Sequence, residues 1–122
     1  MALQRYASAM NEVKLLLFDV FGTLVDWHGS IAREVHGQLA ARGIAVDGAA
    51  FAIAWRDQYQ PAMEEVRSGR LPFSKLDVLH RRNLDVVLNA FGLDHVGGDT
   101  RVQLNFAWHR LDAWPDVTPG LA

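Results

Sequence analysis

One aspartate of this sequence is placed where a carboxylate could act as a nucleophile. Asp19 lies near the end of an apolar run at residues 13–20, and Gly22 and Thr23 follow it closely. We expect the run to be a strand buried on both faces, because short apolar runs that end at a turn are typical of parallel sheets. A carboxylate at the end of such a strand lies at the crevice where open α/β sheets bind ligands. From the residues alone, Asp19 either attacks a substrate to form a covalent ester or only caps a turn.

A longer pattern around Asp19 favours the first role. Residues 18–31 read Phe-Asp-Val-Phe-Gly-Thr-Leu-Val-Asp-Trp-His-Gly-Ser-Ile. This stretch resembles the first motif of the haloacid dehalogenase superfamily and, through its Val-Asp-Trp, the type II 2-haloacid dehalogenase branch. The resemblance implies that Asp19 is the nucleophile and that the hydroxyl of Thr23 holds its carboxylate. It also implies hydrolysis of 2-haloalkanoic acids to 2-hydroxy acids through an aspartyl ester, without a cofactor or metal.

The residue two positions after Asp19 bears on which reaction is catalysed. Phosphatases of this superfamily usually have a second aspartate there, which protonates the leaving alcohol. Phe21 can neither donate nor accept a proton. Because halide departs without a proton, we expect dehalogenation, with a phosphatase or other phosphoryl hydrolase of the same superfamily as the alternative. Phe21 is compatible with simple packing in the core as well.

Arg56 is the second residue with a predicted role. By order and spacing it matches the arginine that binds the departing halide and the substrate carboxylate in this branch. A guanidinium is permanently cationic and presents several donors to an anion. Without the resemblance, Arg56 would be interpreted as an exposed helix arginine paired with a carboxylate. Four aromatic residues are candidates for the wall of an apolar substrate pocket: Phe21, Trp27, Tyr59 and Phe73. Aromatic residues at helical spacing more often belong to the core.

Apolar residues at helical spacing predict helices after residue 24. The predicted helices run from Ser30, the N-cap, to Arg42; from Asp47, the N-cap, past Met63; from residue 74 to 91; and from 99 to 114, with one more starting at Thr118. Gly43 should end the first of them, and Pro61 should kink or break the second.

A single buried strand followed by helices is an incomplete arrangement, because the strand's backbone groups need neighbouring strands. The expected fold class is therefore α/β but mostly α as given: a Rossmann-like core represented only by its first strand, with a helical cap of the four-helix-bundle type. We expect the strand and nucleophile loop at residues 1–27, the cap at 28–112 and a segment returning to the core at 113–122. One alternative is that the apolar run opens a helix. Another is that the chain is a non-catalytic helical association module, in which the apolar strand at residues 13–20 is exposed or paired between molecules.

Composition narrows the classes of partner. The chain has 122 residues, half of them hydrophobic, a net charge of -2 and no cysteine, so disulfides and thiolate sites are excluded. No basic patch indicates nucleic acid or a membrane surface, and the scattered histidines indicate no metal site. Residues 1–11 do not resemble a signal peptide, so we expect a cytoplasmic protein. The resemblance implies a small 2-haloacid as substrate, a homodimer formed through cap helices, and further motifs beyond residue 122 without which we expect little activity.

Overall fold

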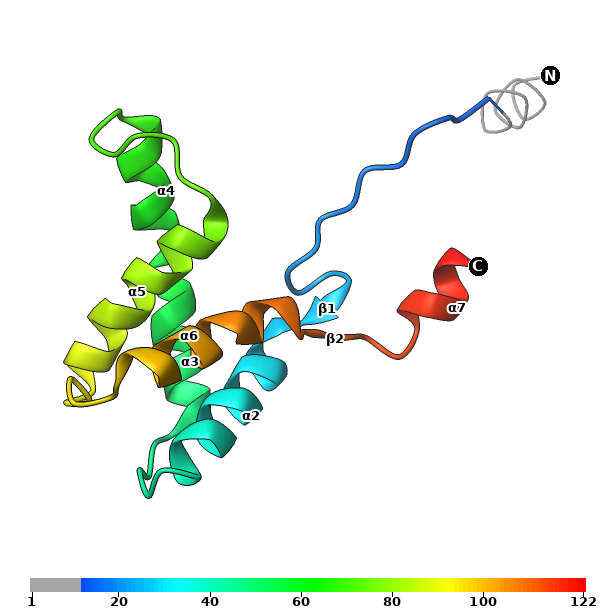
Figure 1. The fold of residues 1–122 in the computed structure, drawn as a ribbon. Coiled ribbons are helices and arrows are strands. Elements are labelled where there is room, and N and C mark those ends of the chain that lie inside the picture. Colours follow the sequence, from blue (N-terminus) through cyan, green and yellow to red (C-terminus); the bar gives the residue numbers. More distant parts are fainter. Residues whose placement is uncertain (1–11) are drawn as a thin grey trace.

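Helices make up most of residues 12–122, the part of the chain that this computed structural model describes (Figure 1). The prediction that residues 1–11 are not a signal peptide lies outside the described residues. The elements in chain order are β1 (Val25–Asp26), α2 (Trp27–Ala40), α3 (Gly48–Asp57), α4 (Tyr59–Arg67), α5 (Leu76–Ala90), α6 (Gly98–Asn105), the 3-10 helix η1 (Phe106–His109), β2 (Asp112–Ala113) and α7 (Val117–Leu121). The predicted fold class is confirmed: residues 12–122 are mostly helical, with one small two-stranded sheet.

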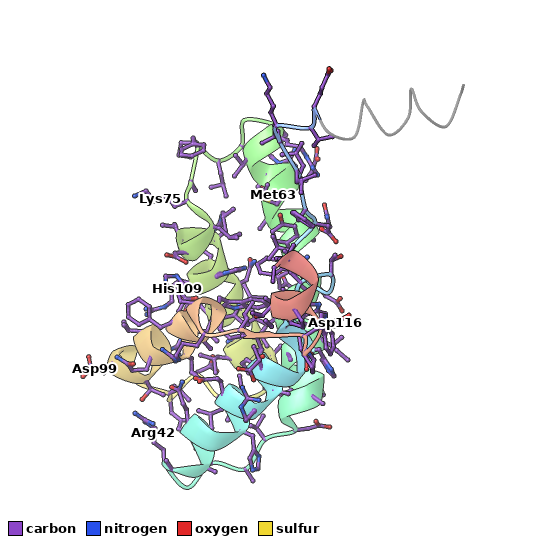
Figure 2. The ribbon with its side chains drawn as sticks, turned by 90° about the vertical axis from the view of Figure 1, so that its right-hand side faces the viewer. Arg42, Met63, Lys75, Asp99, His109 and Asp116 are labelled. Atoms are coloured by element: carbon purple, nitrogen blue, oxygen red, sulfur yellow. The ribbon has the colours of Figure 1, made fainter. Side chains whose placement is uncertain are left out.

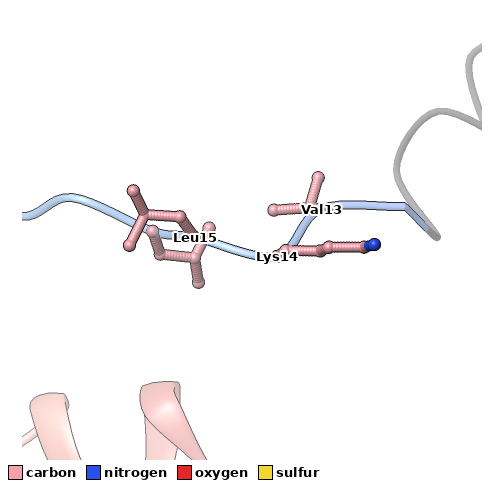
Figure 3. Close-up of a pocket in the computed structure, with 4 residues that line it drawn as sticks. Val13, Lys14 and Leu15 are labelled. Atoms are coloured by element: carbon pink, nitrogen blue, oxygen red, sulfur yellow. The ribbon is translucent and has the colours of Figure 1, made fainter.

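The apolar run at residues 13–20 is not the buried strand that we expected, nor does it open a helix. It extends away from the helices (Figure 1), and its side chains are exposed, with Leu17 at 87 %. Figure 3 shows the side chains of Val13, Lys14 and Leu15 on this extended segment, and residues 13–16 line an open hollow there. A strand is stabilised by the ladders of its neighbours, and within residues 12–122 the only named strands are β1 and β2, of two residues each.

The first helix, α2, begins before Ser30, its predicted N-cap. Asp26 is the N-cap, and its carboxylate accepts a hydrogen bond from the Gly29 amide at 2.9 Å. Ser30 is buried within the first turn, where its hydroxyl accepts from the Asp112 amide at 2.9 Å. The Ser30 hydroxyl therefore binds a residue that is distant in the sequence and does not cap the helix. Gly43 ends this region as predicted, with a φ of 74° that favours glycine.

The second predicted helix is divided into α3 and α4. Asp47 caps α3 as predicted, accepting from the Ala50 amide at 3.1 Å. The break lies at Gln58, just after Asp57. Pro61 explains this position, because a proline cannot donate to the carbonyl four residues earlier and its ring clashes with that carbonyl, here that of Asp57. The Ala62 amide then bonds the Gln58 carbonyl at 3.1 Å, and the helical ladder resumes.

The helix predicted at residues 99–114 is shorter than expected. It ends at Asn105, tightens into η1, and is followed by β2, which pairs antiparallel with β1 through Val25–Ala113 and Asp26–Asp112. Pairing with a strand almost 90 positions away overrides the local helical spacing. The helix predicted at residues 74–91 is α5, and the one predicted to start at Thr118 is α7, which begins at Val117.

The core lies between α2, α3, α5 and the α6–η1 segment. Its members are apolar and at most 9 % exposed: Ile31, Val35, Leu39, Phe51, Ala52, Trp55, Leu84, Val87, Leu88, Leu93, Val96, Leu104, Ala107 and Trp108. Charged side chains such as Arg42, Asp99 and Asp116 lie at the periphery (Figure 2). The helix pair α2–α3 is closely packed, since a Cβ at Gly48 would lie 2.4 Å from the Ala32 carbonyl oxygen.

Candidate active site

Residues 19–24 form a tight loop, here called the Asp19 loop. The Val20 carbonyl accepts hydrogen bonds from the amides of Thr23, Leu24 and Val25, and Gly22 takes the positive φ of 86° that the turn requires. The Thr23 hydroxyl donates to Asp19 Oδ2 at 2.7 Å. Two residues predicted to act together are therefore in contact. The hydrogen bond fixes one carboxylate oxygen of an otherwise exposed side chain.

The chain that leaves the helices holds this loop from the other side. The Trp114 indole N–H donates to the Gly22 carbonyl at 3.0 Å, and the Trp114 amide donates to the Leu24 carbonyl at 3.1 Å. Together with the β1–β2 pair, these contacts tie the Asp19 loop to the segment that follows η1. The loop is thus held through the Gly22 and Leu24 carbonyls, even though the apolar run before it has no partner among the described residues.

The guanidinium of Arg56 lies among three aromatic rings. Its carbon is 4.2 Å from the ring centroid of Tyr59, 5.0 Å from that of Phe21 and 5.9 Å from that of Trp27. All three distances are within the range of cation–π attraction. Three of the four aromatic residues predicted to line a substrate pocket are thus in place around Arg56, and we call these three rings the aromatic cage. The fourth, Phe73, is 87 % exposed and is not among them.

The Arg56 guanidinium has unused hydrogen-bonding capacity. Its Nη1 atom is buried and has no hydrogen-bond partner, and within residues 12–122 no carboxylate forms an ion pair with it. This differs from the exposed, paired arginine that was the alternative interpretation. A buried donor without an acceptor is costly, so the position favours an anion that would accept from it.

Phe21 connects the Asp19 loop to this cationic site. Its ring is half-buried, meets Trp108 edge-on at 5.7 Å and lies under the Arg56 guanidinium. Both interpretations of Phe21 are therefore compatible with the structure: it packs against the core and lines the cage. No proton donor occupies its position.

Two residues next to the site were not identified from the sequence. Trp108 contacts Phe21 and Trp27, and His80 stacks on Trp108 with a centroid distance of 4.4 Å. Burial lowers the pKa of His80 to about 4, and the positive charge of Arg56 contributes, while Asp77 opposes the shift. The spacing of Leu76, His80, Leu84 and Leu88, four residues apart, was the signal that His80 faces the core.

Residues 12–122 contain no cluster of three or more histidine, cysteine or acidic side chains placed to hold a metal ion. In the same part of the chain, every helix is too short or too polar to cross a membrane.

Comparison with known proteins relates this arrangement to solved enzymes. No family model and no curated protein matches the sequence. A defluorinating L-2-haloacid dehalogenase is 46 % identical over 85 % of this chain and 43 % of its own, with a TM-score of 0.82. A second L-2-haloacid dehalogenase is 39 % identical over 82 % of this chain and 42 % of its own, with a TM-score of 0.75.

A more distant match shows the fold alone. The L-2-haloacid dehalogenase from Xanthobacter autotrophicus, solved with chloropropionic acid covalently bound, is 21 % identical over 84 % of this chain and 38 % of its own, with a TM-score of 0.66. The chain thus spans less than half the length of each of these three solved enzymes.

Proposed function

We propose a hydrolytic function from one premise: this chain belongs to the haloacid dehalogenase family and is similar to part of the L-2-haloacid dehalogenases. The proposed reaction of the whole enzyme converts a 2-haloalkanoic acid into a 2-hydroxy acid. In the first step, an Asp19 carboxylate oxygen attacks the carbon that bears the halogen. A carbon–oxygen bond forms, the carbon–halogen bond breaks, and halide leaves with the electron pair.

Two contacts support Asp19 as the attacking group. The Thr23 hydroxyl donates to Oδ2, which orients the carboxylate and leaves Oδ1 for the attack. The backbone of the loop is fixed by three amides on the Val20 carbonyl. A nucleophile held in one orientation loses less entropy on reaching the transition state than a freely rotating one.

One observation carries the proposal more than any other: Phe21, two residues after Asp19, is in contact with the Arg56 guanidinium at 5.0 Å. The Phe21 ring therefore belongs to the Asp19 loop and also contacts the Arg56 guanidinium, whose Nη1 atom is buried and has no hydrogen-bond partner. Charge that develops on a departing halide can be stabilised there. A carboxylic acid substrate would have a partner in the same guanidinium.

In the second step, water attacks the carbonyl carbon of the aspartyl ester, regenerates Asp19 and releases the hydroxy acid. The chain matches less than half the length of its solved relatives. We propose that residues of the whole enzyme outside this matched part activate the water. The chain alone should then turn over little or no 2-chloropropionate, because groups that act as a unit lose activity together when one is missing.

We also propose a division of labour along the chain. Residues 1–27 would supply the strand and the Asp19 loop, residues 28–112 the cap with Arg56, and residues 113–122 the return to the core. The β1–β2 pair supports this division, since it joins the segments on either side of the helices.

The proposal can be tested by joining the chain to the remaining length of the relative with 46 % identity. The chimera should release halide from 2-chloropropionate, and Asp19→Asn should lower kcat by about 1,000-fold or more. Arg56→Met should lower kcat/KM by roughly 100-fold. Arg70→Met is the matched control, because Arg70 is an exposed cap arginine paired with Glu65, and it should change neither constant. Equal losses in both arginine variants would contradict the role of Arg56.

A phosphatase is the less favoured enzymatic function, because Phe21 supplies no proton for an alcohol leaving group. Magnesium-dependent hydrolysis of p-nitrophenyl phosphate by the chimera, in the absence of halide release, would favour it instead.

An association module is a second candidate, and the exposed apolar residues 13–20 favour it. Size-exclusion chromatography of the 122-residue chain tests this function: self-association that Leu15→Lys and Leu17→Lys abolish supports it, and a monomer at all concentrations argues against it.

A further inference from the structure

Trp108 lies at the centre of an aromatic cluster that reaches from the Asp19 loop to α5. Its ring meets Phe21 edge-on at 5.7 Å and Trp55 edge-on at 5.4 Å. It is nearly parallel to Trp27 at 6.5 Å and to His80 at 4.4 Å, with interplanar angles of 21° and 23°. The side chain is almost fully buried. Four elements of the chain are thereby joined through one indole ring.

We propose that Trp108 is the positioning residue of the aromatic cage, holding Phe21 and Trp27 in place around the Arg56 guanidinium. The guanidinium contacts these two rings and Tyr59, so Trp108 acts on it through Phe21 and Trp27. The importance of this role for catalysis rests on the proposed function, in which Arg56 receives the halide. The positioning itself can be measured without any substrate.

The backbone explains why Trp108 reaches this place. Helix α6 tightens at Phe106 into η1, and after Arg110 the chain turns into β2. Strand β2 pairs with β1, and Trp27 follows β1 directly. Trp27 therefore follows one strand of the antiparallel pair directly, and Trp108 precedes the other by a few residues. The strand pair thus brings the two segments that carry these indole rings together.

The interactions of Trp108 are those of packing. Its indole nitrogen and both ring nitrogens of His80 are buried and make no hydrogen bond. The stacked His80 ring supports the indole without drawing it toward a polar partner. Ring area and ring geometry then determine how firmly Trp108 holds Phe21 and Trp27. A smaller ring at position 108 would leave both with more freedom to move relative to the guanidinium.

The test uses the nuclear magnetic resonance signal of the Arg56 Nε–H group in the 122-residue chain. Three aromatic rings within 6 Å displace this signal from that of an exposed arginine such as Arg70. Trp108→Phe should reduce the displacement by changing the contributions of Phe21 and Trp27, while the contribution of Tyr59, which Trp108 does not contact, remains. Phe106→Leu is the matched control: Phe106 lies in the same 3-10 helix, is 44 % exposed and contacts His109 instead of the cage. It should leave the Arg56 signal in place.

The inference is overturned if Trp108→Phe leaves the Arg56 signal unchanged, or if both variants move it equally. Should Trp108→Phe not fold, Phe21→Leu decides instead, because Phe21 touches both Trp108 and Arg56. It should then shift the Trp108 indole N–H signal together with that of Arg56, and a shift of Arg56 alone refutes the role of Trp108.

Titration of the wild-type chain with sodium bromide separates this inference from the proposed function. A bromide-dependent shift of the Arg56 signal supports anion binding there. Its absence counts against the proposed function, while the variants still decide whether Trp108 positions the cage.

Discussion

The contact between α2 and α3 gives a prediction in which one kind of substitution has opposite effects at two sites. Gly48 is the first residue of α3, and a Cβ there would lie 2.4 Å from the Ala32 carbonyl oxygen and 3.3 Å from the His36 Cβ. Ordinary contacts begin near 3.4 Å. Gly48→Ala therefore forces the two helices apart by roughly 1 Å, because the obstacle is backbone and cannot rotate away.

The size of the effect follows from two opposing terms. Overpacking of this kind costs about 1–3 kcal/mol. Replacing a helical glycine by alanine returns about 0.5–1 kcal/mol, since glycine loses more conformational freedom on folding. We expect Gly48→Ala to lower the free energy of unfolding by about 1–2 kcal/mol. Gly37 in α2 is exposed, and a Cβ there would meet no atom within 4 Å apart from the neighbouring backbone of its own helix, so Gly37→Ala should raise the free energy of unfolding by about 0.5–1 kcal/mol.

Urea unfolding followed by far-ultraviolet circular dichroism measures both values. Equal m-values in the two variants would show that the change is one of stability and not of the unfolded state. The melting temperature should move by roughly 3–5 °C for each kcal/mol in a chain of this size. A Gly48→Ala variant as stable as the wild type would refute the close packing of α2 on α3. Because α2 carries Trp27 and α3 carries Arg56, such a result would also contradict the placement of these two residues in the aromatic cage.

Three further predictions concern single contacts. Burial lowers the pKa of His80 from 6.5 to about 4, so folding favours the neutral imidazole. Its contribution to the free energy of unfolding is fully present above pH 6.5. The contribution falls at lower pH, because the unfolded chain binds a proton that the folded chain does not. Urea unfolding should show a loss of about 2 kcal/mol between pH 7 and pH 5, which His80→Leu should remove. Arg101→Met leaves the carbonyls of Val96 and Asp94 without their guanidinium donor and should cost about 2–3 kcal/mol. Trp114→Phe removes the donor to the Gly22 carbonyl and should speed amide hydrogen exchange in residues 19–24, at a cost to global stability of about 1 kcal/mol or less.

Each of these three has an outcome that would contradict it. A pH profile that is the same in wild type and His80→Leu would mean that another group causes the loss. Arg82→Met is the control for Arg101, since Arg82 is exposed on α5, and equal costs would show that the Arg101 contacts are unimportant. Unchanged exchange in residues 19–24 of Trp114→Phe would show that the loop is held by its own backbone hydrogen bonds.

Local signals in the sequence predicted the parts of the fold that depend on neighbours in the chain. Asp47 caps α3 because its side chain reaches an amide three residues away, and the effect of Pro61 lies four residues before it. The contact between Asp19 and Thr23 is equally local. Such features are encoded within a single turn, so they can be inferred without knowledge of the rest of the molecule.

The features that were missed depend on distant partners. The helix predicted to reach Trp114 ends at Asn105, because the following residues pair with β1. Ser30 was expected to cap a helix, but its hydroxyl accepts from Asp112, 82 residues away. Trp108 lies inside the helix predicted at residues 99–114, and its contacts with Phe21 and Trp27 join it to residues about 80 positions away. Residues 13–20 have the composition of a strand, but composition cannot provide the neighbours that a strand pairs with.

The most direct test of the central claim is a single turnover of the chimera with 2-chloropropionate in water enriched in oxygen-18. If Asp19 is the nucleophile, hydrolysis of its ester puts the heavy oxygen into the Asp19 carboxylate. Mass spectrometry should then find the label in the peptide that contains Asp19, while the hydroxy acid receives its new oxygen from the enzyme. Heavy oxygen in the hydroxy acid, with none in the Asp19 peptide, would mean that water displaces the halide directly and would contradict the account.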